Sequence, residues 1–96
     1  MITRYAVVAL LTMLAACAGA PVQEMSDARQ AVRAAQAAGA AERAPAELAQ
    51  AQKLIDEAQQ HLQRHEYQQA QEAALQARQE AIRALEVSRQ AAGGTR

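Results

Sequence analysis

The sequence predicts an all-α fold, a small three-helix bundle over residues 22–92. Strong helix formers, chiefly Ala, Gln, Glu, Leu and Arg, fill almost every position of this region. Residues that favour sheets are scarce, and the 96-residue chain has no Phe or Trp. Apolar residues recur at spacings of three and four, the period of a helix face. A chain of this length is expected to form one domain with a small core.

The first helix is expected over about residues 22–38. Pro21 suits a first helical turn, and Glu24 lies where a carboxylate favours the helix dipole. Gly39 follows the last periodic residue and predicts a left-handed C-terminal cap. The apolar stripe of this helix consists of Met25, Ala28, Val32 and Ala35.

The second helix is expected over about residues 45–64, after a connection at 40–44. Pro45 fits a first helical position, but Ala44 is a poor N-cap, so this boundary is predicted to fray. Leu54 widens an apolar face made of Leu48, Ala51, Ile55, Ala58 and Leu62.

The third helix is expected over about residues 66–91, followed by a loose tail at 93–96. Gly93 and Gly94 are predicted to end it. Its stripe contains Tyr67, Ala70, Ala74, Ala77, Ala81 and Ala84, and is flanked by Leu75, Ile82 and Leu85.

No Gly or Pro separates the second helix from the third, but the phase of the stripe predicts a turn. Continuing the second repeat past Leu62 would place His65, Gln69 and Glu72 in the seam, whereas the observed stripe restarts at Tyr67. A tight turn at residues 64–66 resolves this conflict, because His tolerates the left-handed conformation better than most residues. The alternative is one continuous rod of about 46 residues, roughly 69 Å long.

The N-terminal segment has the layout of a secretory signal. Arg4 precedes an apolar run at residues 5–14, which is shorter than the roughly 20 residues needed to cross a bilayer. The run ends in Leu14, Ala15, Ala16 and Cys17, and Cys17 is the only cysteine of the chain.

These four residues resemble the lipobox of bacterial lipoproteins. The resemblance implies cleavage between Ala16 and Cys17, a diacylglycerol on the Cys17 sulfur and a further acyl chain on the new amine. Ala18, rather than an aspartate, follows the cysteine, which implies the periplasmic face of a Gram-negative outer membrane. The expected organisation is a signal peptide at 1–16, a lipidated tether at 17–21, a helical domain at 22–92 and a tail. An ordinary cleaved signal is the alternative.

Two further resemblances concern the helical region. Tyr67, Ala70 and Ala77, with Ala58, resemble one tetratricopeptide-type hairpin, although a solenoid of such repeats needs about three units to be stable. The order of features over residues 21–90 also resembles a family of uncharacterised bacterial lipoproteins, the domain-of-unknown-function family numbered 4398. That family implies no activity. The residues that carry it are Gly39, Ala40, Ala41, Ala44, Pro45, Ala46, Glu47, Leu48, Leu54, Ala58, Tyr67, Gln68, Gln69 and Ala70.

One candidate metal site lies on the second helix. Glu57, His61 and His65 follow one another at spacings of four and so line one face, where two imidazoles and a carboxylate would suit zinc or copper. No further His or Cys completes the usual set of three or four ligands, so we expect a solvated face and no cofactor besides the lipid.

Catalysis is not expected. Ser26 and Ser88 have no His within helical reach, and Asp56 and Glu57 lie outside any predicted apolar pocket. The formal net charge of zero gives no bulk attraction for nucleic acid.

The sequence therefore predicts a lipid-anchored structural or adaptor protein with an envelope protein partner or a second copy of itself. The alternatives are a metal- or ligand-binding module and an oligomeric coiled-coil rod. Arg29 and Arg33 lie on one face near the anchor, as solvated charges or as contacts to anionic headgroups.

Overall fold

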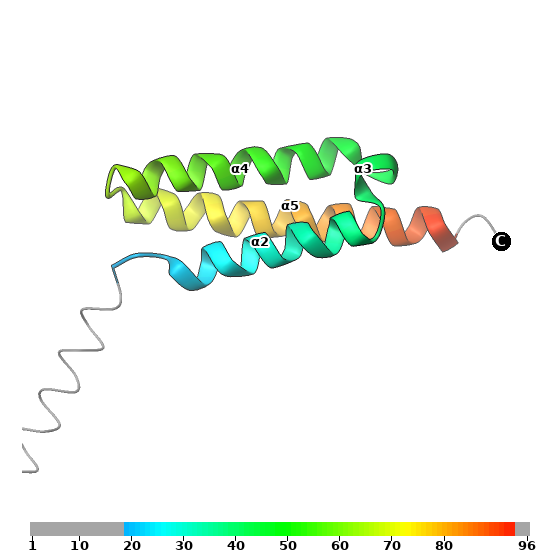
Figure 1. Ribbon diagram of the computed structural model, residues 1–96, viewed down its shortest axis with the longest axis horizontal. Helices are drawn as coiled ribbons and strands as arrows, with labels where there is room; N and C mark the ends of the chain where they lie inside the picture. Colours follow the sequence, from blue (N-terminus) through cyan, green and yellow to red (C-terminus); the bar gives the residue numbers. More distant parts are fainter. Residues whose placement is uncertain (1–18, 94–96) are drawn as a thin grey trace, which may run out of the picture.

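The computed structural model describes residues 19–93. These residues form four helices, α2 (Val22–Ala37), α3 (Ala40–Arg43), α4 (Pro45–Gln63) and α5 (Tyr67–Gly93), and contain no strand (Figure 1). The predicted all-α fold is confirmed, and each long helix lies within two residues of its expected bounds. The predicted cleavage site and lipid attachment at Ala16 and Cys17 lie outside the described residues.

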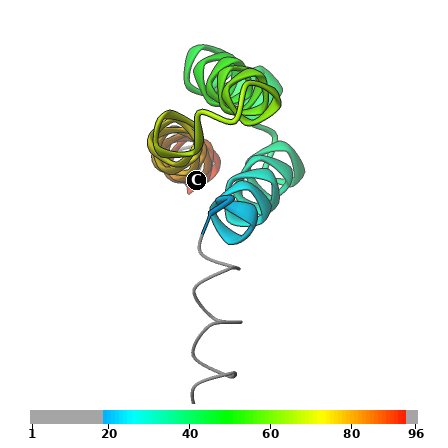
Figure 2. The same ribbon diagram turned by 90° about the vertical axis from the view of Figure 1, so that its left-hand side faces the viewer.

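The three long helices pack as an antiparallel hairpin, α4–α5, with α2 laid alongside it. Most contacts join α5 to α4 and to α2, whereas α2 and α4 touch much less. Viewed end-on, the three helices sit at the corners of a triangle (Figure 2). The start of α2 and the α4–α5 turn lie at one end, and α3 and the end of α5 at the other (Figure 1).

The predicted turn at residues 64–66 is confirmed, which excludes the continuous rod. His65 adopts a φ of 61°, the one positive φ of a non-glycine residue in the described range. The His65 N–H donates to the Leu62 carbonyl at 3.0 Å, and the Glu66 N–H donates to the His61 carbonyl at 2.9 Å. This pair of bonds is the Schellman motif, which satisfies the last carbonyls of a helix.

The connection between α2 and α4 agrees with the prediction at Gly39 and differs from it at residues 40–44. Gly39 has a φ of 85°, so the expected left-handed cap is confirmed. The expected connection at 40–44 instead folds into the single turn α3, because helix formers follow the glycine and the Ala44 N–H reaches the Ala40 carbonyl at 2.8 Å. The Ala44 side chain makes no capping hydrogen bond to α4. It is almost fully buried, and its packing stabilises the start of this helix instead.

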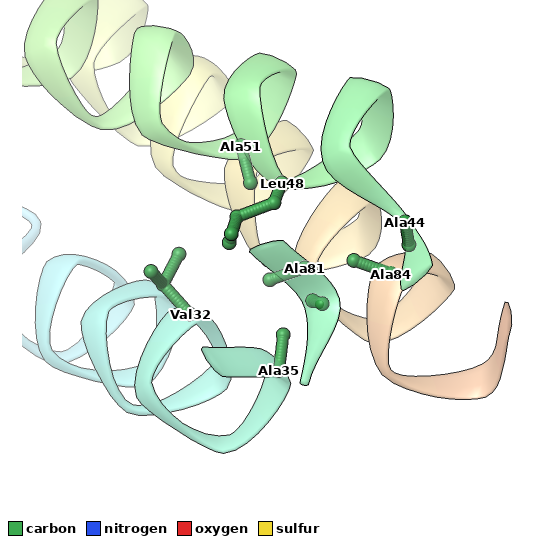
Figure 3. Packing of buried hydrophobic residues seen from close by; sticks show 8 residues of the cluster. Val32, Ala35, Ala44, Leu48, Ala51, Ala81 and Ala84 are labelled. Carbon is green, nitrogen blue, oxygen red and sulfur yellow. The ribbon is translucent and has the colours of Figure 1, made fainter. Parts of the chain in front are cut away.

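The core is built from alanine on α5 and from larger side chains on its neighbours. The α5 stripe is fully buried from Ala70 to Ala84, and Ser88 continues it with its Oγ bonded to the Ala84 carbonyl at 2.7 Å. Met25 and Val32 of α2, with Leu48 and Leu54 of α4, fill the space above the alanines. Figure 3 shows one such cluster, formed by Val32, Ala35, Ala40, Ala44, Leu48, Ala51, Ala81 and Ala84.

Some residues expected in the core lie at its margin. Ile55 and Leu62 are half-buried, while Leu54 is buried in their place. Tyr67, expected in the α5 stripe, is 36% exposed, and the flanking Leu75 and Ile82 are 41% and 37% exposed. The reason is geometric. Helix α4 faces both α5 and α2, which shifts its buried face toward Leu54. One side of α5, by contrast, is covered by no other helix of the described residues.

Candidate functional site

A groove runs between α2 and α5 on the side that neither α3 nor α4 lines. Its walls come from Asp27, Gln30, Ala31 and Ala34 of α2 and from Arg78 and Ile82 of α5. Leu75 lies three residues before Arg78 and therefore on the same face of α5. The groove thus has two alanines on its α2 wall and Ile82 on its α5 wall, and the exposed Leu75 lies on the same face of α5 beyond the lining residues.

Polar side chains make up half of the residues that line this groove: Asp27, Gln30 and Arg78. The Asp27 carboxylate accepts a hydrogen bond from the Gln23 side-chain amide at 2.9 Å, one turn back on α2. Arg78 is exposed and makes no ion pair with any residue between 19 and 93. A shallow surface that mixes Ala31, Ala34 and Ile82 with one cation, one anion and one amide is of the kind that suits a helix of a protein partner.

The second notable region is the end of the bundle where α2 begins. Pro21 is buried, and its carbonyl accepts the Met25 N–H at 3.1 Å. Gly19 lies close to the Tyr67 ring, since a Cβ at this position would be 3.8 Å from Cε2. Gln71 of α5 donates to the Glu24 carboxylate at 3.4 Å. These contacts fix the segment before α2 against the first two turns of α5.

Exposed side chains surround this contact. Val22 is 72% exposed although it is apolar, and Arg64 and His65 project from the turn beside Tyr67. The His65 and Tyr67 rings lie 5.8 Å apart between centroids, at a tilt of 48°. We call Val22, Arg64, His65 and Tyr67 the tether end.

The structure separates the three candidate metal ligands. His61 turns its Nδ1 toward Glu66 Oε1 at 3.2 Å, and His65 lies against Tyr67 in the left-handed turn. Glu57 is half-buried one turn before His61 and joins neither contact. Across residues 19–93, no three His, Cys, Asp or Glu side chains converge in a way that could hold a metal ion.

The His61–Glu66 pair was missed by the sequence reasoning. Its partners are five residues apart, a spacing that does not face on a straight helix and becomes close only because the chain reverses at His65. The Schellman signature around a left-handed residue is the signal that would have found it.

The remaining candidates stay apart from one another. The Ser88 hydroxyl is bonded within its own helix, and Ser26 lies on α2. Asp56 is exposed on α4, and Arg29 and Arg33 are exposed on α2.

A family model described as "Domain of unknown function (DUF4398)" matches residues 23–93, which is the whole bundle from α2 to α5. Neither a curated protein nor a solved structure gives a significant match to the chain. Over residues 19–93, no helix has both the length and the apolar character required to cross a membrane.

Proposed function

Since this chain belongs to the DUF4398 family, whose function is unknown, we propose from its surfaces that it is a non-catalytic, lipid-anchored adaptor of the cell envelope. In this proposal Cys17 carries the diacylglycerol and the N-acyl chain. The protein sits on the periplasmic face of a Gram-negative outer membrane, and the α2–α5 groove binds a protein partner.

The observation that carries the adaptor role is the placement of Leu75 and Ile82. A bundle whose core is mostly alanine is short of buried apolar area, and two of its largest side chains nevertheless lie outside that core. Both are on one face of α5, and Ile82 lines the groove opposite Ala31 and Ala34. Because Ala31 and Ala34 of α2 are small, a helix of a partner protein could approach closely. Such an approach would bury the side chains of Leu75 and Ile82.

Support for the anchor comes from the sequence. Leucine and two alanines precede Cys17 at the end of a short apolar run. Two or more acyl chains give stable attachment at about 0.8 kcal/mol per buried methylene. Attachment to the bilayer raises the local concentration of the groove for partners in the same membrane.

Crosslinking in cells tests the adaptor role. A photoreactive amino acid at Ala34, on the groove wall, should give one discrete adduct, whereas the same probe at the exposed Gln59 of α4 should give none. The Leu75→Gln/Ile82→Gln variant should lose the Ala34 adduct, because it removes the exposed apolar side chains of this face of α5 without touching buried residues.

The size of the adduct identifies the class of partner: twice the mass of the chain indicates a second copy, and any other mass indicates a different envelope protein. Intact-mass measurement of the same material checks that Cys17 is acylated. Equal adducts at Ala34 and Gln59, or an adduct that survives the double substitution, would contradict the groove as the binding surface.

A further inference from the structure

We propose that the bundle stands upright on the bilayer, with the tether end (Val22, Arg64, His65 and Tyr67) against the lipid headgroups. This inference rests on the proposed acylation of Cys17 and adds to it which surface of the folded domain meets the membrane.

The length of the tether sets the first constraint. Only Ala18 separates Cys17 from Gly19, and an extended chain gains at most about 3.6 Å per residue. Gly19 itself lies beside the Tyr67 ring, at a position where a Cβ would be 3.8 Å from Cε2 of the tyrosine. With two residues of reach, the acylated Cys17 of this proposal lies within about 7 Å of Gly19, at the end of the bundle where α2 begins and α4 turns into α5 (Figure 1).

The chemistry of the tether end suits an interface between water and lipid. Tyr67 offers an apolar ring with a polar tip, the combination that is enriched at membrane surfaces. Arg64 is exposed and forms no ion pair within residues 19–93, so its guanidinium is free to bind a lipid phosphate. The acidic groups nearby are already engaged, Glu66 with His61 and Glu24 with Gln71. Val22 adds an exposed apolar side chain at the same end.

Of the long sides of the bundle, the α5 face with Leu75 and Ile82 carries exposed apolar side chains, and the outer side of α4 does not. A helix that lies flat in the interface presents a continuous apolar face to the lipid. The outer side of α4 carries instead an exposed polar row, which contains Gln52, Lys53, Asp56, Gln59 and Gln60. Lying on the α2–α5 groove would press Asp27 into the headgroups and cover the surface assigned to the partner. The upright orientation leaves the groove open, with Leu75 about 12 Å and Ile82 about 22 Å along α5 from Tyr67.

This orientation also decides the role of two arginines on α2. Arg29 and Arg33 follow Val22 by seven and eleven residues, so they lie about 10 and 16 Å farther along the helix. In an upright bundle they point into solvent rather than into the headgroup layer.

Depth measurements on the full lipidated protein in vesicles test the proposal. The Cys17 sulfur is blocked by its lipid, so an introduced cysteine is the one free thiol for a fluorophore. Gln68→Cys and Gln90→Cys are a matched pair, both exposed glutamines of α5, about 33 Å apart along the helix. In vesicles that contain phosphatidylglycerol and a nitroxide-headgroup lipid, we expect strong loss of fluorescence at position 68 and none at position 90.

The outcomes separate this inference from the proposed function. Equal loss at both positions means that the bundle lies flat and overturns the upright orientation. No loss at either position, in protein that floats with the vesicles, also overturns it but leaves the anchor intact. Protein that fails to float with the vesicles overturns the anchor and this inference together.

A second comparison tests Tyr67 as a positioning residue. Tyr67→Ala should reduce the loss at position 68, because the ring that lies beside Gly19 is removed, whereas Tyr67→Phe should keep it. Circular dichroism of both variants reports that the helices remain. A Tyr67→Ala protein that retains the full difference between positions 68 and 90 would overturn the role of the ring.

Discussion

Two residues with positive φ set where the chain reverses. Gly39, at 85°, ends α2, and His65, at 61°, ends α4. Glycine adopts this conformation without steric cost, whereas a residue with a Cβ does not. His65 keeps it because the Schellman bonds to Leu62 and His61 and the ring contact with Tyr67 surround it. The same geometry brings His61 to Glu66, so one strained residue creates the side-chain hydrogen bond that joins α4 to the residue after the turn.

We predict opposite effects of substitution at these two positions. Gly39→Ala should lower the free energy of unfolding by about 1–2 kcal/mol, because alanine disfavours the left-handed region. His65→Gly should raise it by about 1 kcal/mol or less, since relief of the strain is offset by a more flexible unfolded chain. Urea unfolding followed by circular dichroism measures both. Destabilisation by His65→Gly of more than about 1 kcal/mol would show that the ring contact and not the backbone holds the turn.

At the scale of the elements, the sequence predicted the helices well and their outer faces less well. Local chemistry fixes the ends, as Gly39, Pro45 and the phase shift at His65 show. The four stripe residues of α2 are all buried as expected. The width of the buried face of each helix depends on where the two neighbouring helices lie. The local pattern of apolar residues does not contain this information. Leu54 is therefore buried more deeply than Ile55, and Leu75 and Ile82 face outward.

For the candidate site, too, the sequence predicted local features but not the contacts between helices that are distant in the chain. The sequence predicts an acylation motif, which lies outside the described residues, and it placed Ile82 beside the α5 stripe, but it did not place Ile82 opposite Ala31 and Ala34. That juxtaposition arises from the packing of α2 against α5, helices separated by α3 and α4 in the chain. The contact between Gly19 and Tyr67 is equally non-local, and nothing in the spacing of the residues could have predicted it.

Leu54 and Leu75 provide a matched test of the observed packing. Leu54 is 7% exposed and packs with Ala28 and Ala77, whereas Leu75 is 41% exposed. Leu54→Ala should destabilise the domain by about 2–4 kcal/mol through lost burial and the cavity left behind. Leu75→Ala should change stability by about 0.5 kcal/mol or less, as expected at a surface. Chemical denaturation of the two variants measures the difference, and equal costs would contradict the assignment of Leu75 to the surface.

At the scale of the whole molecule, α5 is the shared element. Its alanine stripe from Ala70 to Ala84 supports both α2 and α4, which touch each other little. Half-buried Ile55 contacts all three clusters of the core and links them along α4. Because neither α2 nor α4 can bury its apolar face without α5, the three helices are expected to unfold as one unit. The two proposed contacts of the molecule then use separate regions of one rigid body: the tether end for the bilayer and the groove for the partner.

The single tyrosine of the helical domain makes this cooperativity measurable. The chain has no Trp or Phe, and its other tyrosine, Tyr5, lies in the predicted signal peptide, so the fluorescence of Tyr67 reports on the tether end alone. Circular dichroism reports on all helices together. The two urea transitions should coincide, because Tyr67 begins the helix on which the rest of the core is assembled. A fluorescence transition at lower urea would mean that the tether end opens before the bundle does. The short tether could then no longer orient the domain, and the upright arrangement would have to depend on direct binding of Arg64 and His65 to lipid.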